Sequence, residues 1–203
     1  MKTTTTILLA GVLLFLPVLV QAAAPMKTVE DHVNQLMAVL GDPSLSGAAG
    51  EEKKKDAVRG ISNSLFDFGE LARFSLGRNW RDFNPQQQDE FADLYRRLLE
   101  GIYMGRLLQY KDEKVVFNRE AELSSTRSEV QTHIVASSGN IPIDYRLVQK
   151  GGVWKVYDLV IENASLAKNY RSQFNSILTK DPPDKLIDML RQKVKEQEAD
   201  NAK

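Results

Sequence analysis

Two hydrophobic periods alternate along the chain and divide it into three parts. Before Lys114, apolar side chains recur every three or four positions, which is typical of amphipathic helices. From Lys114 to Ile161 the spacing is two, which is typical of strands that bury one face. The helical spacing then returns. This order of helices, strands and helices predicts an α+β fold rather than a doubly wound parallel sheet.

Four helices are expected before the strands. The first has Val29, Val33, Leu36, Met37 and Leu40 at helical spacing and ends before Gly41. Residues 47–55 are Gly, Ala and charge, and we interpret them as a loop that leads into a second helix over about 51–65. A short helix follows over 68–76. The fourth starts at an Asn84-Pro85 cap with Gln87 in a capping box and reaches about Gln109, with a wide apolar stripe.

The strand region predicts a curved, four-stranded antiparallel sheet with helices packed on one face. Its strands are marked by Val115 and Phe117, by 130–136, by 141–147 and by 153–161. The pairs Gly139-Asn140 and Gly151-Gly152 are interpreted as hairpin turns. The fourth strand is apolar on both faces and must therefore be covered on both sides. Two helices close the chain, one from Leu166 and one after Pro182-Pro183, and residues 196–203 are expected to fray.

The N-terminus has the three parts of a secretory signal peptide. A lone Lys2 precedes an apolar run over 7–20, and small residues follow at 22–24. The run is short for a membrane span and contains Pro17. We expect residues 1–22 to be removed, with cleavage after Ala22 or Ala24, which leaves one soluble domain over 25–203 in the periplasm.

Composition excludes several classes of function. The chain has 27 basic and 27 acidic side chains, and loss of Lys2 leaves 26 against 27, so the electrostatic footprint of a nucleic-acid-binding protein is absent. There is no Cys, and hence neither a disulfide nor a lipid anchor on cysteine. The core alone must stabilise the exported domain, and a chain of about 180 residues is long enough for that.

Candidate catalytic chemistry is sparse. His32 and His133 are far apart and lack a second ligand at metal-binding spacing, so no metal site is expected. No nucleophile elbow or phosphate-binding glycine loop occurs. Asp144 and Asp158, on neighbouring strands near tyrosines, leave a small acid-base enzyme as the alternative. Both alternate with the apolar residues of their strands, however, and so are expected to point away from them. A third hypothesis is an interaction module with a solid core.

Several segments together resemble one family. Residues 66–80 (FDFGELARFSLGRNW) are followed by 141–147 (IPIDYRL), 154–158 (WKVYD) and 169–174 (NYRSQF), in that order. These motifs are similar to those of the MlaC family of periplasmic phospholipid carriers, and the similarity runs from about Val29 to Lys193. The sequence departs from the family pattern at Glu162-Asn163-Ala164, near the expected pocket mouth. A related branch of the family is associated with hopanoid-type lipids, so this departure leaves the exact cargo open.

The resemblance implies a cone related to nuclear transport factor folds, with phospholipid acyl chains inside and the headgroup outside. It implies a monomer that shuttles lipid between an outer-membrane lipoprotein-porin complex and an inner-membrane ABC transporter with an MCE-domain subunit. No cofactor is implied other than the phospholipid cargo. At roughly 0.8 kcal/mol per methylene, exposing a chain of about 14 methylenes costs on the order of 11 kcal/mol. The cavity must therefore enclose almost the whole tail, and we expect roughly 1,000 Å³.

With this resemblance, the inward-facing residues become candidates for the cavity lining, although the same residues would equally fill a solid core. The candidate lipid-binding residues are Phe68, Leu71, Phe74, Trp80, Phe91, Tyr95, Leu98, Leu99, Ile102, Tyr103, Val115, Ile143, Tyr145, Tyr157, Leu159, Ile161, Leu166 and Tyr170. For the headgroup at the mouth, the candidates are Arg106, Lys111, Lys168 and Arg171, for each of which a solvated surface role is the alternative.

Overall fold

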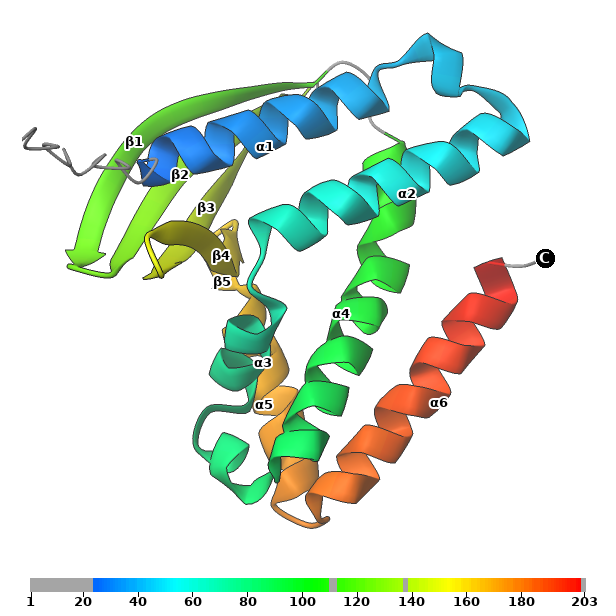
Figure 1. The fold of residues 1–203 in the computed structure, drawn as a ribbon, viewed down its shortest axis with the longest axis vertical. Helices are drawn as coiled ribbons and strands as arrows, with labels where there is room; N and C mark the ends of the chain where they lie inside the picture. Colours follow the sequence, from blue (N-terminus) through cyan, green and yellow to red (C-terminus); the bar gives the residue numbers. More distant parts are fainter. Residues whose placement is uncertain (1–23, 110–112, 137–138, 202–203) are drawn as a thin grey trace, which may run out of the picture.

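The structure is a computed structural model that describes residues 24–109, 113–136 and 139–201. The expected signal peptide over 1–22 lies outside the described residues. The helices before the sheet are α1 (Pro25–Leu40), α2 (Gly47–Leu65), α3 (Phe68–Leu76) and α4 (Pro85–Leu108), with 3-10 turns at Pro43–Leu45 and Gly77–Asp82. The sheet comprises β1 (Lys114–Ser124), β2 (Arg127–Ala136), β3 (Gly139–Lys150), β4 (Val153–Ile161) and β5 (Ala164–Ser165). Helices α5 (Leu166–Leu178) and α6 (Pro183–Asn201) follow (Figure 1).

The sheet is antiparallel and open, in the order β1-β2-β3-β4-β5. Its fifth strand, β5, is not predicted from the sequence, because it is only two residues long. The order of elements confirms the predicted α+β class. Helix α6 extends to Asn201, through residues expected to fray, and Arg97 of α4 pairs with its Glu198 at 2.5 Å.

The turns illustrate where local sequence signals succeed and fail. Gly151 and Gly152 have φ of +56° and +82°, which confirms the predicted hairpin turn between β3 and β4. The predicted turn at Gly139-Asn140 is wrong, because both residues lie in β3 and pair with Ala136 and Val135 of β2. The interpretation of 47–55 as a loop is also wrong, since α2 begins at Gly47.

The turn between β4 and β5 explains the departure from the family pattern. Glu162 and Asn163 both have positive φ, at +49° and +67°. Asn adopts this left-handed conformation more readily than other residues with a side chain, so Asn163 suits the positive φ of this turn.

The helices divide between the sheet and a separate bundle, rather than all packing on one face. Helix α1 lies across the sheet and contacts β1, β2 and β4, while α3, α4, α5 and α6 gather beside the β4 edge (Figure 1). Two hydrophobic clusters result. The sheet cluster joins α1 to the sheet through Val29, Val130 and Val156, and the helical cluster is built from α3 to α6.

Strand β4 belongs to both parts. Its Val156 lies in the sheet cluster, whereas the ring of its Tyr157 packs edge-on against Phe74 of α3 at 5.3 Å. A register shift opposite Arg146 and Leu147 accompanies this change of side. The strand is thus covered on both faces, as its apolar pattern predicts.

Candidate functional site

A cavity of about 570 Å³, called the main cavity below, lies between the sheet and helices α1, α2 and α4. Its volume is within the range of small-molecule sites and about half of the roughly 1,000 Å³ expected from the sequence. Its walls are predominantly aliphatic and aromatic. Such a surface favours an apolar ligand, because enclosing apolar groups removes them from water.

The sheet wall follows from strand alternation. Val115 of β1 is paired with Ile134 of β2, and Tyr145 of β3 with Leu159 of β4, so these side chains share the face that α1 covers. Ile143 and Ile161 form the next pair on the same face. The two-residue alternation that predicts the strands therefore also determines which of their residues form this wall of the cavity.

Ten of the eighteen predicted lipid-binding residues line the main cavity. They come from α3, α4, the strands β1, β3 and β4, and the start of α5: Phe68, Leu71, Leu99, Tyr103, Val115, Ile143, Tyr145, Leu159, Ile161 and Leu166.

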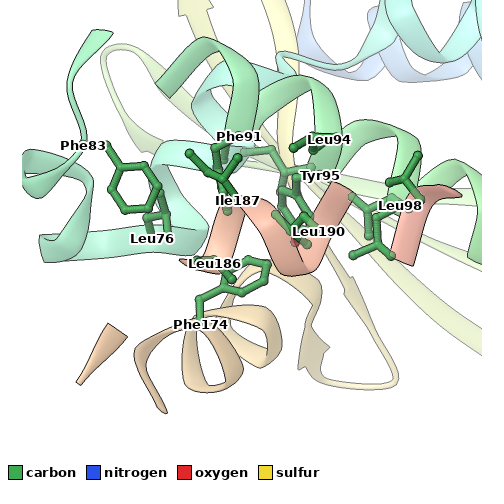
Figure 2. Packing of buried hydrophobic residues seen from close by; sticks show 14 of the residues in the cluster. Leu76, Phe83, Phe91, Leu94, Tyr95, Leu98, Phe174, Leu186, Ile187 and Leu190 are labelled. Carbon is green, nitrogen blue, oxygen red and sulfur yellow. The ribbon is translucent and has the colours of Figure 1, made fainter. Parts of the chain in front are cut away.

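The other eight do not line the main cavity. They are Phe74, Trp80, Phe91, Tyr95, Leu98, Ile102, Tyr157 and Tyr170. All but Tyr157 belong to the helical cluster or pack against it. Figure 2 shows three of them, Phe91, Tyr95 and Leu98, beside α6. Phe91 and Phe174, for example, meet edge to face at 5.3 Å, and the Tyr95 hydroxyl accepts a hydrogen bond from Ser75. The structure thus places these residues in packed apolar contacts away from the main cavity.

Helices α1 and α2 provide lining that the sequence analysis does not assign. Val33, Leu36, Met37 and Leu40 form the α1 part, and Val58, Ile61 and Leu65 the α2 part. The helical spacing of the α1 residues is visible in the sequence, but nothing in it shows that this stripe faces a cavity as well as the sheet. Leu36 and Met37 are only half-buried, as is expected for side chains that border an empty space.

The predicted mouth residues separate in the structure. Arg106 lines the main cavity, and Lys111 lies outside the described residues. Lys168 and Arg171 do not line the cavity. The Arg171 guanidinium instead donates to the Phe74 carbonyl oxygen, at 3.0 Å from Nε, and stacks over the Phe74 ring, which ties α5 to α3.

A charged cluster stands in the wall where α2 meets α4. Arg59 of α2 pairs with Glu100 of α4, and Arg96 reaches the other oxygen of Glu100 at 3.3 Å. Asp56 binds Arg59 at 2.7 Å from the solvent side. The hydrogen bond to Glu100 raises the pKa of the Arg59 guanidinium, although burial opposes it. Arg59, Arg96 and Glu100 all line the main cavity, so this cluster makes one part of its wall charged.

Tyr145 is a half-buried polar side chain of the sheet wall. Burial raises the pKa of its hydroxyl to about 12, so the side chain is neutral at physiological pH. A neutral, largely apolar ring is compatible with a hydrocarbon ligand.

The two aspartates of the enzyme alternative do not line the main cavity. Asp158 is fully buried, where it accepts hydrogen bonds from the Ser165 hydroxyl at 2.6 Å and the Ala167 amide at 3.0 Å. Asp158 therefore fixes the start of α5 to β4. Asp144 is paired in register with Gln131, and burial together with the nearby Glu129 raises its pKa. As predicted, both side chains point away from the apolar neighbours on their strands that line the main cavity.

Neither a membrane-spanning helix nor a metal-binding cluster occurs within residues 24–109, 113–136 and 139–201. None of the helices there is long and apolar enough to cross a membrane. No cluster of three or more His, Asp or Glu side chains suited to a metal ion is found among these residues.

Comparison with known proteins identifies the family. The family model described as MlaC protein matches residues 30–192. This chain belongs to the MlaC family.

Two curated relatives agree with the MlaC assignment. The "Intermembrane phospholipid transport system binding protein MlaC" of Haemophilus influenzae is 28% identical over 122 residues, or 58% of this chain and 57% of that protein. The match thus spans less than two thirds of this relative. The "Toluene tolerance protein ttg2D" of Pseudomonas putida is 25% identical over 157 residues, or 76% of this chain and 73% of that protein.

A solved structure agrees as well. The phospholipid-binding protein from Ralstonia solanacearum, determined in complex with a phospholipid, superimposes with a TM-score of 0.77 at 26% sequence identity. The alignment covers 86% of this chain and 99% of that one. The open sheet and helices described above are therefore the fold of a protein solved with a phospholipid bound.

Proposed function

We propose that this MlaC-family chain is a periplasmic carrier that holds phospholipid acyl chains in the main cavity. It would shuttle lipid between an outer-membrane lipoprotein-porin complex and an inner-membrane ABC transporter with an MCE-domain subunit. The observation that carries the proposal is the apolar cavity of about 570 Å³ between the sheet and α1, α2 and α4.

Energetics supports a carrier that encloses its cargo. Each methylene exposed to water costs about 0.8 kcal/mol, so a carrier must shield most of a tail to release lipid from a membrane at a useful rate. The apolar wall formed by Tyr145, Leu159 and their neighbours provides such shielding. Arg59, Glu100 and Arg106 make one part of the cavity wall charged. This part would be the polar exit of the cavity.

What is known of two similar proteins supports the same function. One curated relative is named for intermembrane phospholipid transport, and the Ralstonia structure holds a phospholipid. The N-terminal sequence also has the pattern of an export signal, and a periplasmic position lies between the two membranes that such transport would connect.

Transfer between vesicles tests the proposal. Donor vesicles carry a fluorescent phosphatidylethanolamine with a quencher, acceptor vesicles carry neither, and the purified protein is added at increasing concentration. We expect transfer to rise linearly with protein concentration. No increase over the protein-free control would contradict the carrier function. Extraction of the protein-bound lipid in the same preparation identifies the cargo as phospholipid or as a hopanoid-type lipid, and the second result would contradict the proposed cargo.

A further inference from the structure

The apolar stripes of α3 and α5 each cross from the main cavity into the helical cluster. On α3, Phe68 and Leu71 line the cavity, whereas Phe74 packs only against the cluster. On α5, Leu166 lines the cavity and Tyr170 does not. Phe68, Leu71 and Leu166 also belong to the helical cluster or pack against it, so they stand where the cavity ends and the packed core begins. These three residues are called the floor of the main cavity below.

The floor lies away from the charged part of the cavity wall. Arg59 of α2 belongs to that charged part, and α2 continues from Arg59 to Leu65, a distance of about 9 Å at 1.5 Å per residue. Helix α3, which carries most of the floor, begins only after α2 has ended (Figure 1). A tail that enters beside the charged residues, with its headgroup left outside, would therefore direct its terminal methyl group towards the floor.

The start of α3 is fixed to the sheet, which holds the floor in place. Asp67 is the N-cap of this helix and accepts a hydrogen bond from an amide of its first turn at 2.8 Å. The Asp67 amide donates to the Val156 carbonyl oxygen of β4 at 2.9 Å, and its carboxylate pairs with Lys150 of β3 at 2.7 Å. Phe68 follows directly, and its ring stacks on that of Phe66 at 5.5 Å between centroids. These contacts oppose displacement of the floor by a longer tail.

A fixed floor makes the length of the tail matter for binding. Each methylene that the cavity cannot cover remains in water, which weakens binding roughly fourfold. A tail that is too short leaves a gap above the floor and loses the contacts that would fill it. Together these two effects favour tails that just reach the floor.

We propose that Phe68, together with Leu71 and Leu166, determines which acyl-chain length this protein prefers in its phospholipid cargo. Phe68 has the largest side chain of the three and is half-buried, so a smaller residue there extends the cavity at its inner end. This inference rests on the proposed carrier function and adds to it the class of lipid that is selected.

Two substitutions move the floor in opposite directions. Phe68→Ala lowers it, and Leu166→Phe raises it. The matched controls are Phe74→Ala on α3 and Leu178→Phe on α5, both at half-buried positions that do not line the main cavity. Circular dichroism checks that all four variants are folded, and Phe68→Leu replaces Phe68→Ala if that variant does not fold.

The measurement is native mass spectrometry of delipidated protein after incubation with vesicles that contain equal amounts of four phosphatidylglycerols. Their tails are myristoleoyl, palmitoleoyl, oleoyl and eicosenoyl, which increase in length by two methylenes at each step and all contain one double bond. Every protein meets the same vesicles, so the free energy for a lipid to leave the vesicle cancels when variants are compared with the wild type.

We expect Phe68→Ala to raise the ratio of bound eicosenoyl lipid to bound palmitoleoyl lipid by at least about tenfold, because the added space covers methylenes that the wild type leaves in water. Leu166→Phe should lower this ratio by a similar factor. Both controls should keep the wild-type ratio within about twofold.

The contrary outcomes are distinct. If Phe68→Ala and Leu166→Phe keep the wild-type ratio, the floor does not select tail length, while the carrier function stands. If Phe74→Ala shifts the ratio as much as Phe68→Ala, the shift comes from a loosened core and the inference is overturned. If the wild type takes up none of the four lipids, the carrier function itself fails and the chain-length selection with it.

Discussion

Tyr145 lies on the sheet face of the main cavity, paired with Leu159 across the strands, and its burial keeps the hydroxyl neutral. A charge at this position would stand in the space assigned to hydrocarbon. Tyr145→Asp should therefore reduce the amount of lipid extracted from the folded protein by at least about tenfold, because an unpaired carboxylate in apolar surroundings costs several kcal/mol.

The matched control is Val135→Asp. Val135 is 41% exposed on β2 and does not line the main cavity. Circular dichroism should show both variants folded, and only Tyr145→Asp should lose lipid. Full lipid content in folded Tyr145→Asp would show that the tails lie elsewhere.

Glu70 is a buried carboxylate that gives the protein an acid-sensitive contact. Burial alone would raise its pKa, but Arg73 and Lys150, whose Nζ lies 3.3 Å from the carboxylate, more than compensate and lower it. A lowered pKa in the folded state stabilises the protein above the ordinary value of 4.5, and that contribution is lost as the pH falls through the folded-state value.

Glu70→Gln should thus lower the free energy of unfolding by about 1–2 kcal/mol at pH 7. The difference from the wild type should shrink as the pH falls below 4.5, because protonated Glu resembles Gln. Urea denaturation at pH 7 and below pH 4.5 measures this difference in unfolding free energy. The control is Glu122→Gln, at an exposed position. A difference that is constant with pH would exclude the ionic contribution of Glu70.

At the scale of elements, β4 and α5 are joined through one carboxylate. Asp158 accepts from Ser165 and from the Ala167 amide, and the Arg146 guanidinium lies 3.4 Å away. Asp158→Asn should reduce the free energy of unfolding by about 3 kcal/mol, since an amide cannot replace a buried carboxylate among these donors. Lipid content per folded molecule should be unchanged.

Asp144→Asn is the contrasting substitution. Because burial and Glu129 disfavour the charge of Asp144, its removal should be neutral or slightly stabilising in the same urea titration. Loss of lipid transfer without loss of stability in either variant would instead revive an acid-base role for that aspartate.

The hydrophobic periods were sufficient to predict the type and order of the long elements and the fold class. They could not predict the short strand β5, because two residues are too few to show a period. They also could not predict that α2 begins at Gly47, because a start of Gly and Ala residues gives no periodic signal. The turn at Gly139-Asn140 was misplaced for a similar reason: glycine permits a turn but does not require one.

The candidate site was only partly predictable. Tyr145 and Phe91 are both aromatic residues at inward positions, yet one borders the main cavity and the other packs against Phe174. A cavity wall and a solid core need the same apolar side chains at the same spacing, and only the three-dimensional arrangement separates them. Arg106, predicted to lie near the mouth, lines the main cavity, whereas the Arg171 guanidinium binds Phe74 instead.

At the scale of the whole molecule, the fold separates two tasks. The bundle of α3 to α6 buries a tightly packed apolar cluster, part of which Figure 2 shows, while the main cavity lies between the sheet and α1, α2 and α4. A carrier benefits from this division, because the bundle can stabilise a domain without disulfides while the other half keeps space for cargo.

Native mass spectrometry of the purified, untreated protein tests the central claim most directly. The account predicts a protein ion heavier than the apoprotein by the mass of a phospholipid, which on activation releases a species with fatty-acyl chains. Protein that is consistently lipid-free, and that stays so after incubation with phosphatidylethanolamine vesicles, would contradict it.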